Sequence, residues 1–173
     1  MNIKAILETY IARLRGGEHL ISYLRKKGME IGEGTRIFCD ISTTESYLVR
    51  IGDRTTISNN VQLITHDASI QKAIPEASDL FGRIVIGNNC FIGARSIIMY
   101  GVTLPDNTIV AAGSVVTKSV LEEGCVIGGN PARIITTLEK FAKKNEPFAV
   151  NIHGLSKEEK KTLLENEELL VKR

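Results

Sequence analysis

The sequence predicts a mainly β protein in which short parallel strands stack into a solenoid, with helical segments at both ends. Two observations lead to this fold class. Aliphatic residues recur at every sixth position from residue 86 to residue 116, and Asn and Gly residues suited to tight turns fall between them. A period of six fits neither a helix, which repeats every 3.6 residues, nor an ordinary strand, which alternates every two. One short strand plus one turn does account for it, because such units bury a continuous aliphatic column when they stack.

Each six-residue unit, or hexad, has an aliphatic first position and a small or branched fifth position. The first positions are Ile86, Ile92, Ile98, Leu104, Val110 and Val116, and the fifth are Cys90, Ser96, Val102, Thr108, Ser114 and Val120. An earlier run has Ile51, Ile57 and Leu63 at position one, after an entry at Ile31 and Ile37. We expect position one to point into a narrow interior and position five to fill a corner. A β-sandwich with frequent turns is the alternative, but it does not require an uninterrupted period of six.

Bulk composition excludes several classes of protein. The 173 residues suffice for one domain with a real core, and the net charge of +2 gives no reason to expect a nucleic-acid partner. The longest apolar runs are too short to span a bilayer, and the charged N-terminus does not resemble a secretory signal. Three cysteines without a C-x-x-C motif indicate buried thiols in a reducing compartment, so we expect a cytoplasmic protein.

Both ends of the chain are predicted to be helical. Residues 1–30 carry an apolar stripe, a break at "GG" and a possible second helix, and we expect them to cap the open first coil. Their basic residues leave a membrane-surface helix as an alternative. Residues 31–137 form the predicted β domain. Residues 138–173 form a helical extension, with one helix over "TTLEKFAKKN" and another from Ser156, where Glu159 completes a capping box. Leucines of the second helix suggest docking onto a neighbour.

The hexads stop after "LITHDAS" and return at residue 84, which leaves residues 69–82 as a protruding loop. A solenoid tolerates an insertion only at a corner, and long loops in compact domains tend to be functional. His66 stands at position four of its hexad, at the root of this loop. Histidine is suited to taking a proton from an alcohol near neutral pH. A corner histidine that only hydrogen-bonds backbone is the structural alternative.

Two carboxylates are candidates to lie near His66. Counting three hexads back, with a two-residue slip between the Ile37 and Ile51 runs, brings Glu45 and Ser46 below His66. Glu45 is placed either to hold the imidazole or to grip a substrate hydroxyl, and Asp40 lies one face earlier. The alternative for both is an ordinary solvated carboxylate.

The run from "IGNNCFIGARS" to "GNPARII" resembles the hexapeptide-repeat acyltransferases, in particular their O-acetyltransferases that act on sugars and related alcohols. The resemblance covers about residues 31–137. It implies a left-handed parallel β-helix with three hexads per triangular coil and a protruding loop. It also implies a homotrimer with active sites between subunits, and acetyl-CoA as co-substrate without a metal. The absence of the N-terminal extension typical of maltose and galactoside acetyltransferases favours an acceptor from polysaccharide or lipopolysaccharide biosynthesis.

The resemblance also implies roles for individual residues. His66 occupies the place of the family's catalytic histidine. Asp67 stands where many sugar acetyltransferases have proline, and Phe91 stands where many relatives have tryptophan, so both are candidates for the acceptor side. The positions implied to contact coenzyme A are Ala94, Ala112 and Gly113 at the pantetheine, Thr117 and Lys118 near the pyrophosphate and adenine, and Arg133 near the phosphates. Tight corner packing would require the same small residues.

Three other functions are weighed against O-acetyl transfer. A zinc carbonic anhydrase on this fold needs three histidine ligands, and only His66 lies within the repeats. N-acetyl transfer to an amino sugar or antibiotic would use the same base and remains open. A non-catalytic β-helix scaffold would have no need of His66, the small groove residues or Lys118.

Overall fold

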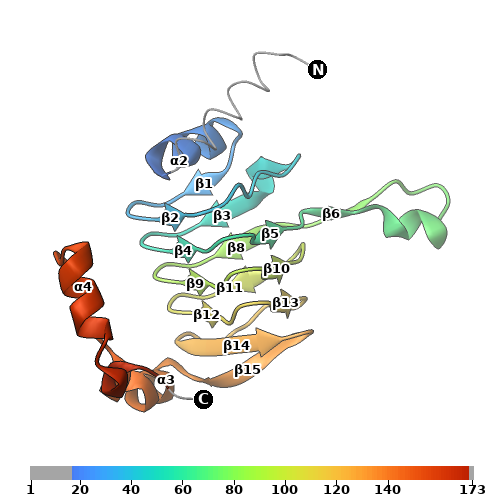
Figure 1. Cartoon of the computed structure of the whole chain (residues 1–173). Helices are drawn as coiled ribbons and strands as arrows, with labels where there is room; N and C mark the ends of the chain where they lie inside the picture. The colour runs from blue at the N-terminus through green and yellow to red at the C-terminus, as the bar shows by residue number, and fades with distance from the viewer. Residues whose placement is uncertain (1–16, 172–173) are drawn as a thin grey trace. The chain divides into compact units, whose positions relative to one another are not determined.

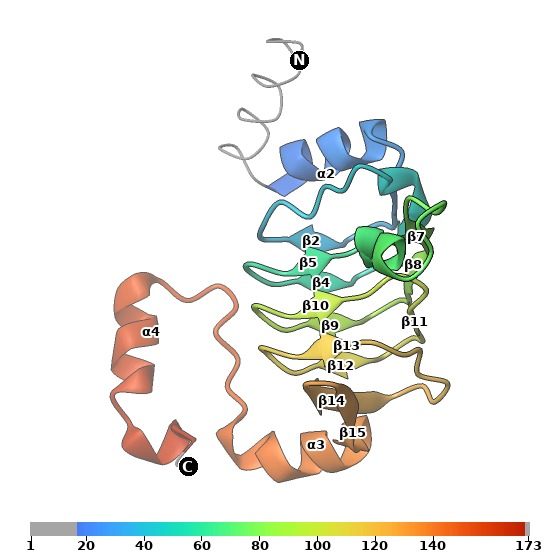
Figure 2. The same cartoon turned by 90° about the vertical axis from the view of Figure 1, so that its right-hand side faces the viewer.

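A computed structural model describes residues 17–171, which fall into two units, one ending at Leu138 and the other beginning at Glu139 (Figures 1 and 2). In the first unit the hexads form strands that pair in parallel from coil to coil and make three faces. No helix within residues 17–171 has the length and apolar character needed to cross a membrane.

Each face is one sheet. The first consists of β1 (Glu30–Ile31), β3 (Val49–Ile51), β8 (Ile84–Ile86) and β11 (Thr103–Leu104). The second consists of β2 (Arg36–Ile37), β4 (Thr56–Ile57), β9 (Phe91–Ile92), β12 (Ile109–Val110), β14 (Cys125–Gly129) and β15 (Ala132–Thr137). The third consists of β5 (Gln62–Leu63), β10 (Ile97–Ile98) and β13 (Val115–Val116).

The register of the strands shows that three hexads make one coil. Ile86 pairs with Leu104, Ile92 with Val110 and Ile98 with Val116, so each partner lies 18 residues further along the chain. The predicted stack of parallel, hexad-based strands is therefore confirmed. The sandwich alternative is wrong, because every strand pair among the hexads is parallel.

The first and fifth positions of the hexads build the core, as predicted. First-position side chains from Ile31 to Val116 are at most 9% exposed, and most fifth-position side chains are buried with them. The polar fifth positions are satisfied at the corners: the hydroxyl of Thr55 donates to the Gly87 carbonyl at 2.8 Å, and that of Thr108 donates to the Pro105 carbonyl at 2.8 Å. Short hydroxyl side chains thus fill the corners without leaving a buried donor unpaired.

The fourth position of nearly every hexad is a left-handed turn. Positive φ angles between 51° and 77° occur at Gly34, Arg54, Asn60, Asn89, Arg95, Gly101, Asn107 and Gly113. Gly and Asn adopt this conformation with little strain, whereas Arg54 and Arg95 adopt it at some cost. The turns repeat in register, so each coil closes at the same three corners as the coil before it.

Close approach of successive coils explains the glycines at position two of the first face. A Cβ added to Gly87 would lie 2.7 Å from the Asp106 backbone nitrogen and 2.8 Å from the Pro105 carbonyl carbon. Beside these glycines a ladder of side chains joins the coils. Asp53 accepts from the Glu33 amide, Asn88 from the Asp53 amide and Asp106 from the Asn88 amide, at 2.7–2.8 Å.

The coil is interrupted twice. Ile31 pairs with Ile51, 20 residues on, and the extra residues fall around the 3₁₀ turn η1 (Ser46–Leu48). Ile51 pairs with Ile86, 35 residues on, and the extra residues form an arm that projects from the stack (Figure 1). The arm's stem is the antiparallel pair β6 (His66–Asp67) and β7 (Leu80–Phe81), with η2 (Ala68–Lys72) beyond it. The excursion therefore begins three residues before the predicted loop.

The two ends of the stack differ from each other. Helix α2 (Gly17–Lys26) buries Leu20, Ile21 and Leu24 in the same cluster as Ile31 and Ile37, and so covers the first coil. The helix expected over the first 14 residues lies outside the described residues. At the other end β15 turns back antiparallel to β14, so Thr136 and Thr137 belong to a strand. The helix expected to begin with these threonines instead starts at Leu138, because the hairpin continues the backbone pairing up to that point.

The second unit contains short helices, which are α3 (Leu138–Asn145, from its second residue), η3 (Glu146–Phe148), α4 (Lys157–Leu164) and η4 (Glu167–Leu169). The capping box predicted at the start of α4 is present, because the Ser156 hydroxyl and the Glu159 carboxylate each accept from the other residue's amide. The helix is shorter than the sequence suggested, and Leu169 belongs to η4.

Replacing Gly87 with alanine should destabilise the β-helix. The added methyl group would overlap backbone of the next coil, which cannot move without breaking the strand register, so we expect a loss of about 1–3 kcal/mol. The midpoint of urea unfolding measures it. Ser58→Ala is the matched control, because position two of that hexad already carries a Cβ. An equal effect of both substitutions would contradict the coil-to-coil explanation.

Candidate active site

His66 lies where the coil is interrupted. It occupies the fourth position of its hexad, at which the other hexads make a left-handed turn, but it begins the extended strand β6 instead. The chain returns at Gly82, whose amide donates to the Thr65 carbonyl at 3.0 Å and closes the base of the arm. The imidazole is 43% exposed, so it is open to a substrate.

Glu45 holds one side of the imidazole. Its Oε2 lies 2.9 Å from His66 Nδ1 and accepts a hydrogen bond from the buried Thr65 hydroxyl at 2.8 Å. An ionised carboxylate only accepts hydrogen bonds, so Nδ1 carries the proton at this contact. Nε2 of the neutral ring then has its lone pair free, which is the state that a general base requires.

The environment keeps Glu45 ionised over the ordinary pH range. A hydrogen bond from the Thr44 side chain contributes most, followed by those from Thr65 and His66, and together they lower the pKa of the Glu45 carboxyl from 4.5 to about 2. Its side chain is only 14% exposed. The carboxylate is therefore a fixed negative charge beside the imidazole at neutral pH.

Asp67 points to a different neighbour from His66. Its carboxylate accepts from the Ser69 amide at 2.8 Å, which caps η2, and from the Tyr100 hydroxyl at 3.3 Å. The Ser69 bonds contribute most to lowering the pKa of Asp67, and desolvation raises that of Tyr100. Asp67 thus anchors the arm to the coil that contains Tyr100. The sequence gave no periodic signal for Tyr100 beyond its position two residues after Ile98, which pairs with Leu63.

The aromatic ring beside His66 is Phe81, which the sequence analysis did not single out. The two residues pair across β6 and β7, and their ring centroids lie 5.9 Å apart. Phe91 lies elsewhere, on β9 of the second face, opposite Thr56 and Ile109. Asp40 is at the corner after β2, where it accepts from the Ser42 amide at 2.9 Å. Within one chain neither Phe91 nor Asp40 joins the group around His66.

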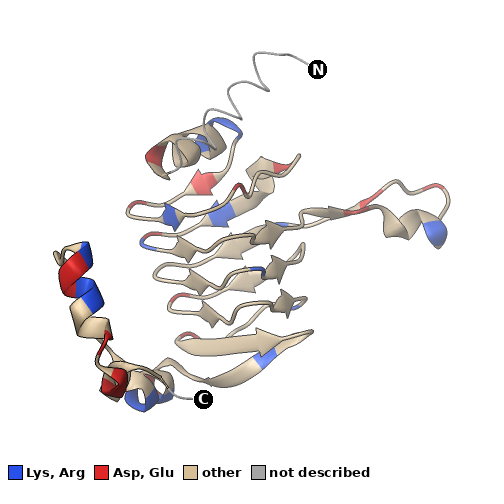
Figure 3. Cartoon of the chain, in the orientation of Figure 1, with Lys and Arg blue, Asp and Glu red and all other residues tan. Residues whose placement is uncertain are grey.

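The residues expected to contact coenzyme A lie along the two edges of the third face. Lys118 and Arg133 line one groove of about 270 Å³, together with Val116, Val120 and Ala132. Figure 3 shows blue on β15, the strand that carries Arg133. Thr117 directly precedes Lys118. Ala94, Ala112 and Gly113 lie at the opposite edge, where the Gly113 amide donates to the Ala94 carbonyl at 2.8 Å.

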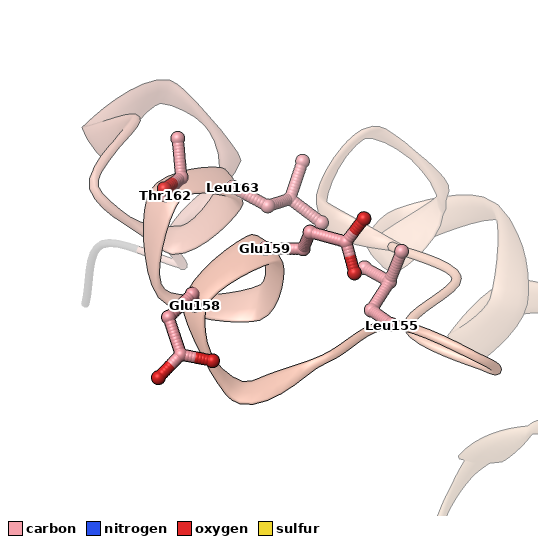
Figure 4. Close-up of a pocket in the computed structure, with 5 residues that line it drawn as sticks. All are labelled: Leu155, Glu158, Glu159, Thr162 and Leu163. Atoms are coloured by element: carbon pink, nitrogen blue, oxygen red, sulfur yellow. The ribbon is translucent and has the colours of Figure 1, made fainter.

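A second pocket, in the Glu139–Arg173 unit, has no groups suited to acyl transfer. It encloses about 500 Å³ and is lined by Leu155, Glu158, Glu159, Thr162 and Leu163 (Figure 4). Glu159 is already engaged in the capping box of α4. Among the described residues no three His, Cys, Asp or Glu side chains are grouped so that they could hold a metal ion.

Comparison with known proteins gives this geometry a context. A family described as "Hexapeptide repeat of succinyl-transferase" matches residues 83–118. Protein CapG of Staphylococcus aureus is 43% identical over 149 residues, which cover 83% of this chain and 86% of CapG. Galactoside O-acetyltransferase of Escherichia coli is 33% identical over 111 residues, which cover 62% of this chain and 54% of that enzyme.

Among solved structures, the hexapeptide-repeat acetyltransferase VCA0836 of Vibrio cholerae, in complex with acetyl-coenzyme A, superposes with a TM-score of 0.51. It is 28% identical, and the alignment covers 65% of this chain and 61% of that one. The repeat register, the matched repeat family and the extent of the similarity to CapG agree. The chain belongs to the hexapeptide-repeat acetyltransferases.

Proposed function

We propose that the protein transfers an acetyl group from acetyl-CoA directly to a hydroxyl group of a sugar, with His66 as the general base. The observation that carries this proposal is the Glu45–His66 pair at the root of the arm, at 2.9 Å, with Nε2 left free. A hydroxyl is a poor nucleophile until its proton is removed as attack proceeds, and an oriented neutral imidazole supplies that function near neutral pH.

The proposed reaction needs no covalent enzyme intermediate. Nε2 of His66 takes the hydroxyl proton while the hydroxyl oxygen bonds to the thioester carbonyl carbon. A main-chain N–H stabilises the resulting oxyanion. The C–S bond then breaks, and the imidazolium returns the proton to the sulfur, so the products are an acetyl ester and free coenzyme A. Glu45 orients the ring and stabilises the imidazolium, as the carboxylate of a catalytic triad does.

The donor's place is proposed from the charge and size of the groove residues. Lys118 and Arg133 supply cationic donors suited to phosphate oxygens. Thr117 is assigned to the same end of the donor. The small residues Ala94, Ala112 and Gly113 leave room for a thin pantetheine arm. The acetyl-coenzyme A complex of the Vibrio relative supports this choice of donor.

The acceptor is assigned by its chemistry. A relative 33% identical to this chain acts as a galactoside O-acetyltransferase, which supports a sugar hydroxyl. Transfer to an amine would use the same base, so the product decides: an O-ester is cleaved by mild base and an amide is not. We further propose the left-handed winding and the homotrimer that the family resemblance implies, with each active site completed by a neighbouring subunit.

Replacing His66 with alanine should abolish acceptor-dependent release of coenzyme A. Loss of a general base costs about 10²- to 10⁴-fold in rate. Thiol release is measured with acetyl-CoA and a panel of pyranosides, nucleotide sugars and amino sugars, and coenzyme A binding is measured separately. His153→Ala is the matched control, because His153 is an exposed residue of the other unit. Full activity of His66→Ala would refute the proposal.

Glu45→Gln should lower kcat about 10- to 100-fold and leave the KM for acetyl-CoA nearly unchanged. The amide keeps the shape but loses the charge that stabilises the imidazolium. Glu30→Gln is the control, because Glu30 is an exposed carboxylate with a 3.8 Å contact to the exposed Arg50. If the two variants behave alike, Glu45 has no role in positioning the base.

The stability of the protein should also depend on Glu45 at acidic pH. A carboxyl whose folded pKa is depressed stabilises the folded state above its unfolded pKa, here near 4.5, and this contribution disappears as the pH falls toward 2. The difference in urea midpoint between wild type and Glu45→Gln should therefore shrink between pH 5 and pH 2. A difference that stays constant over this range would show that Glu45 is not held as an ionised hydrogen-bond acceptor.

A further inference from the structure

The side chain of Phe81 is 55% exposed although it stands beside the base of the site. Phe81 pairs directly with His66 across the two strands of the arm's stem, so both side chains lie on the same face of that ribbon. The rings are tilted by 44° at a centroid distance of 5.9 Å. Such a tilt leaves much of the phenyl face uncovered and open to a further ring.

We infer that Phe81 binds the acceptor, by providing a flat apolar surface on which the C–H face of a pyranose ring stacks. This inference rests on the proposed function of His66. A ring stacked on Phe81 at an ordinary contact distance of about 4.5 Å lies beside the imidazole. One of its hydroxyls is then within reach of Nε2 at a hydrogen-bond distance of about 2.8 Å. Phe81 thus selects a cyclic acceptor and His66 activates it.

The position of Phe81 is fixed by the arm's stem. Its neighbour Leu80 pairs with Asp67, and Asp67 is bonded to Tyr100 of the stack. The next residue, Gly82, donates to the Thr65 carbonyl, and a Cβ there would lie 2.5 Å from the Gly101 amide nitrogen. Because the chain is anchored on both sides of Phe81, its ring can be held ready for a ligand without being buried.

A binding role predicts an acceptor preference that a packing role does not. A pyranoside offers a continuous C–H face, whereas an acyclic polyol with the same hydroxyl groups does not. We therefore expect the wild-type enzyme to prefer pyranosides to galactitol, and we expect this preference to depend on the ring of residue 81.

The test compares Phe81→Tyr, Phe81→Leu and Phe81→Ala with Phe91→Ala. Phe91 is the matched control because it is 44% exposed and lies on a different face. With the pyranoside that serves best in the His66 experiment, kcat/KM should fall about 3- to 10-fold in the Leu and Ala variants, mainly through the acceptor KM. The Tyr variant and Phe91→Ala should stay within twofold of wild type. Acceptor-independent hydrolysis of acetyl-CoA should not change in any of them.

A second readout needs no turnover. In the presence of coenzyme A, sugar protons that stack on a phenyl ring shift upfield in the NMR spectrum, and Phe81→Leu should remove that shift. If Phe81→Leu keeps both the kcat/KM and the shift, the inference is overturned while the proposed function stands. If no pyranoside yields His66-dependent thiol release in the wild type, the proposed function fails and the inference fails with it.

Discussion

The left-handed turn at the fourth position of each hexad is the constraint on which the rest of the structure depends. It returns the chain to the next face after every six residues, so position one always reaches the interior. His66 occupies a fourth position at which the turn is replaced by an extended strand. The core does not suffer, because Leu63 before the arm and Ile84 after it are both buried. The candidate base therefore lies at a point where the chain leaves the repeat without opening the interior.

Stacking supports the site from both sides. Glu45 comes from the coil before His66 and meets its imidazole, while Tyr100 comes from the coil after it and meets Asp67. Two adjacent residues of one strand are thus fixed by two different coils. The coils are held in register by backbone pairing and by the Asp53–Asn88–Asp106 ladder, so these contacts need little further ordering of the chain. A rigid scaffold of this kind is what a precisely placed base requires.

The sequence predicted the parts of this arrangement that repeat. The period of six led to the buried positions, and counting hexads with the two-residue slip brought Glu45 below His66. Phe81 was missed, because antiparallel pairing within the arm leaves no periodic signal. Strand β15 was missed for a related reason: the hairpin at Gly129–Ala132 continues the second sheet in the opposite direction after the hexads end. Phe91 was singled out by analogy with a tryptophan, but the stack places it on another face.

The distribution of the donor residues bears on how a complete site would be assembled. His66 and Lys118 follow β5 and β13 at one edge of the third face, whereas Ala94, Ala112 and Gly113 stand at its other edge. A pantetheine arm that touches the small residues must therefore lie away from the His66 edge of the same chain by the width of that face. If two copies of the chain meet along these edges, the alanine corner of one faces the base of the other. The small residues and the base then act on the same acetyl-CoA only across a subunit boundary, which is the physical reason to propose a trimer with shared active sites.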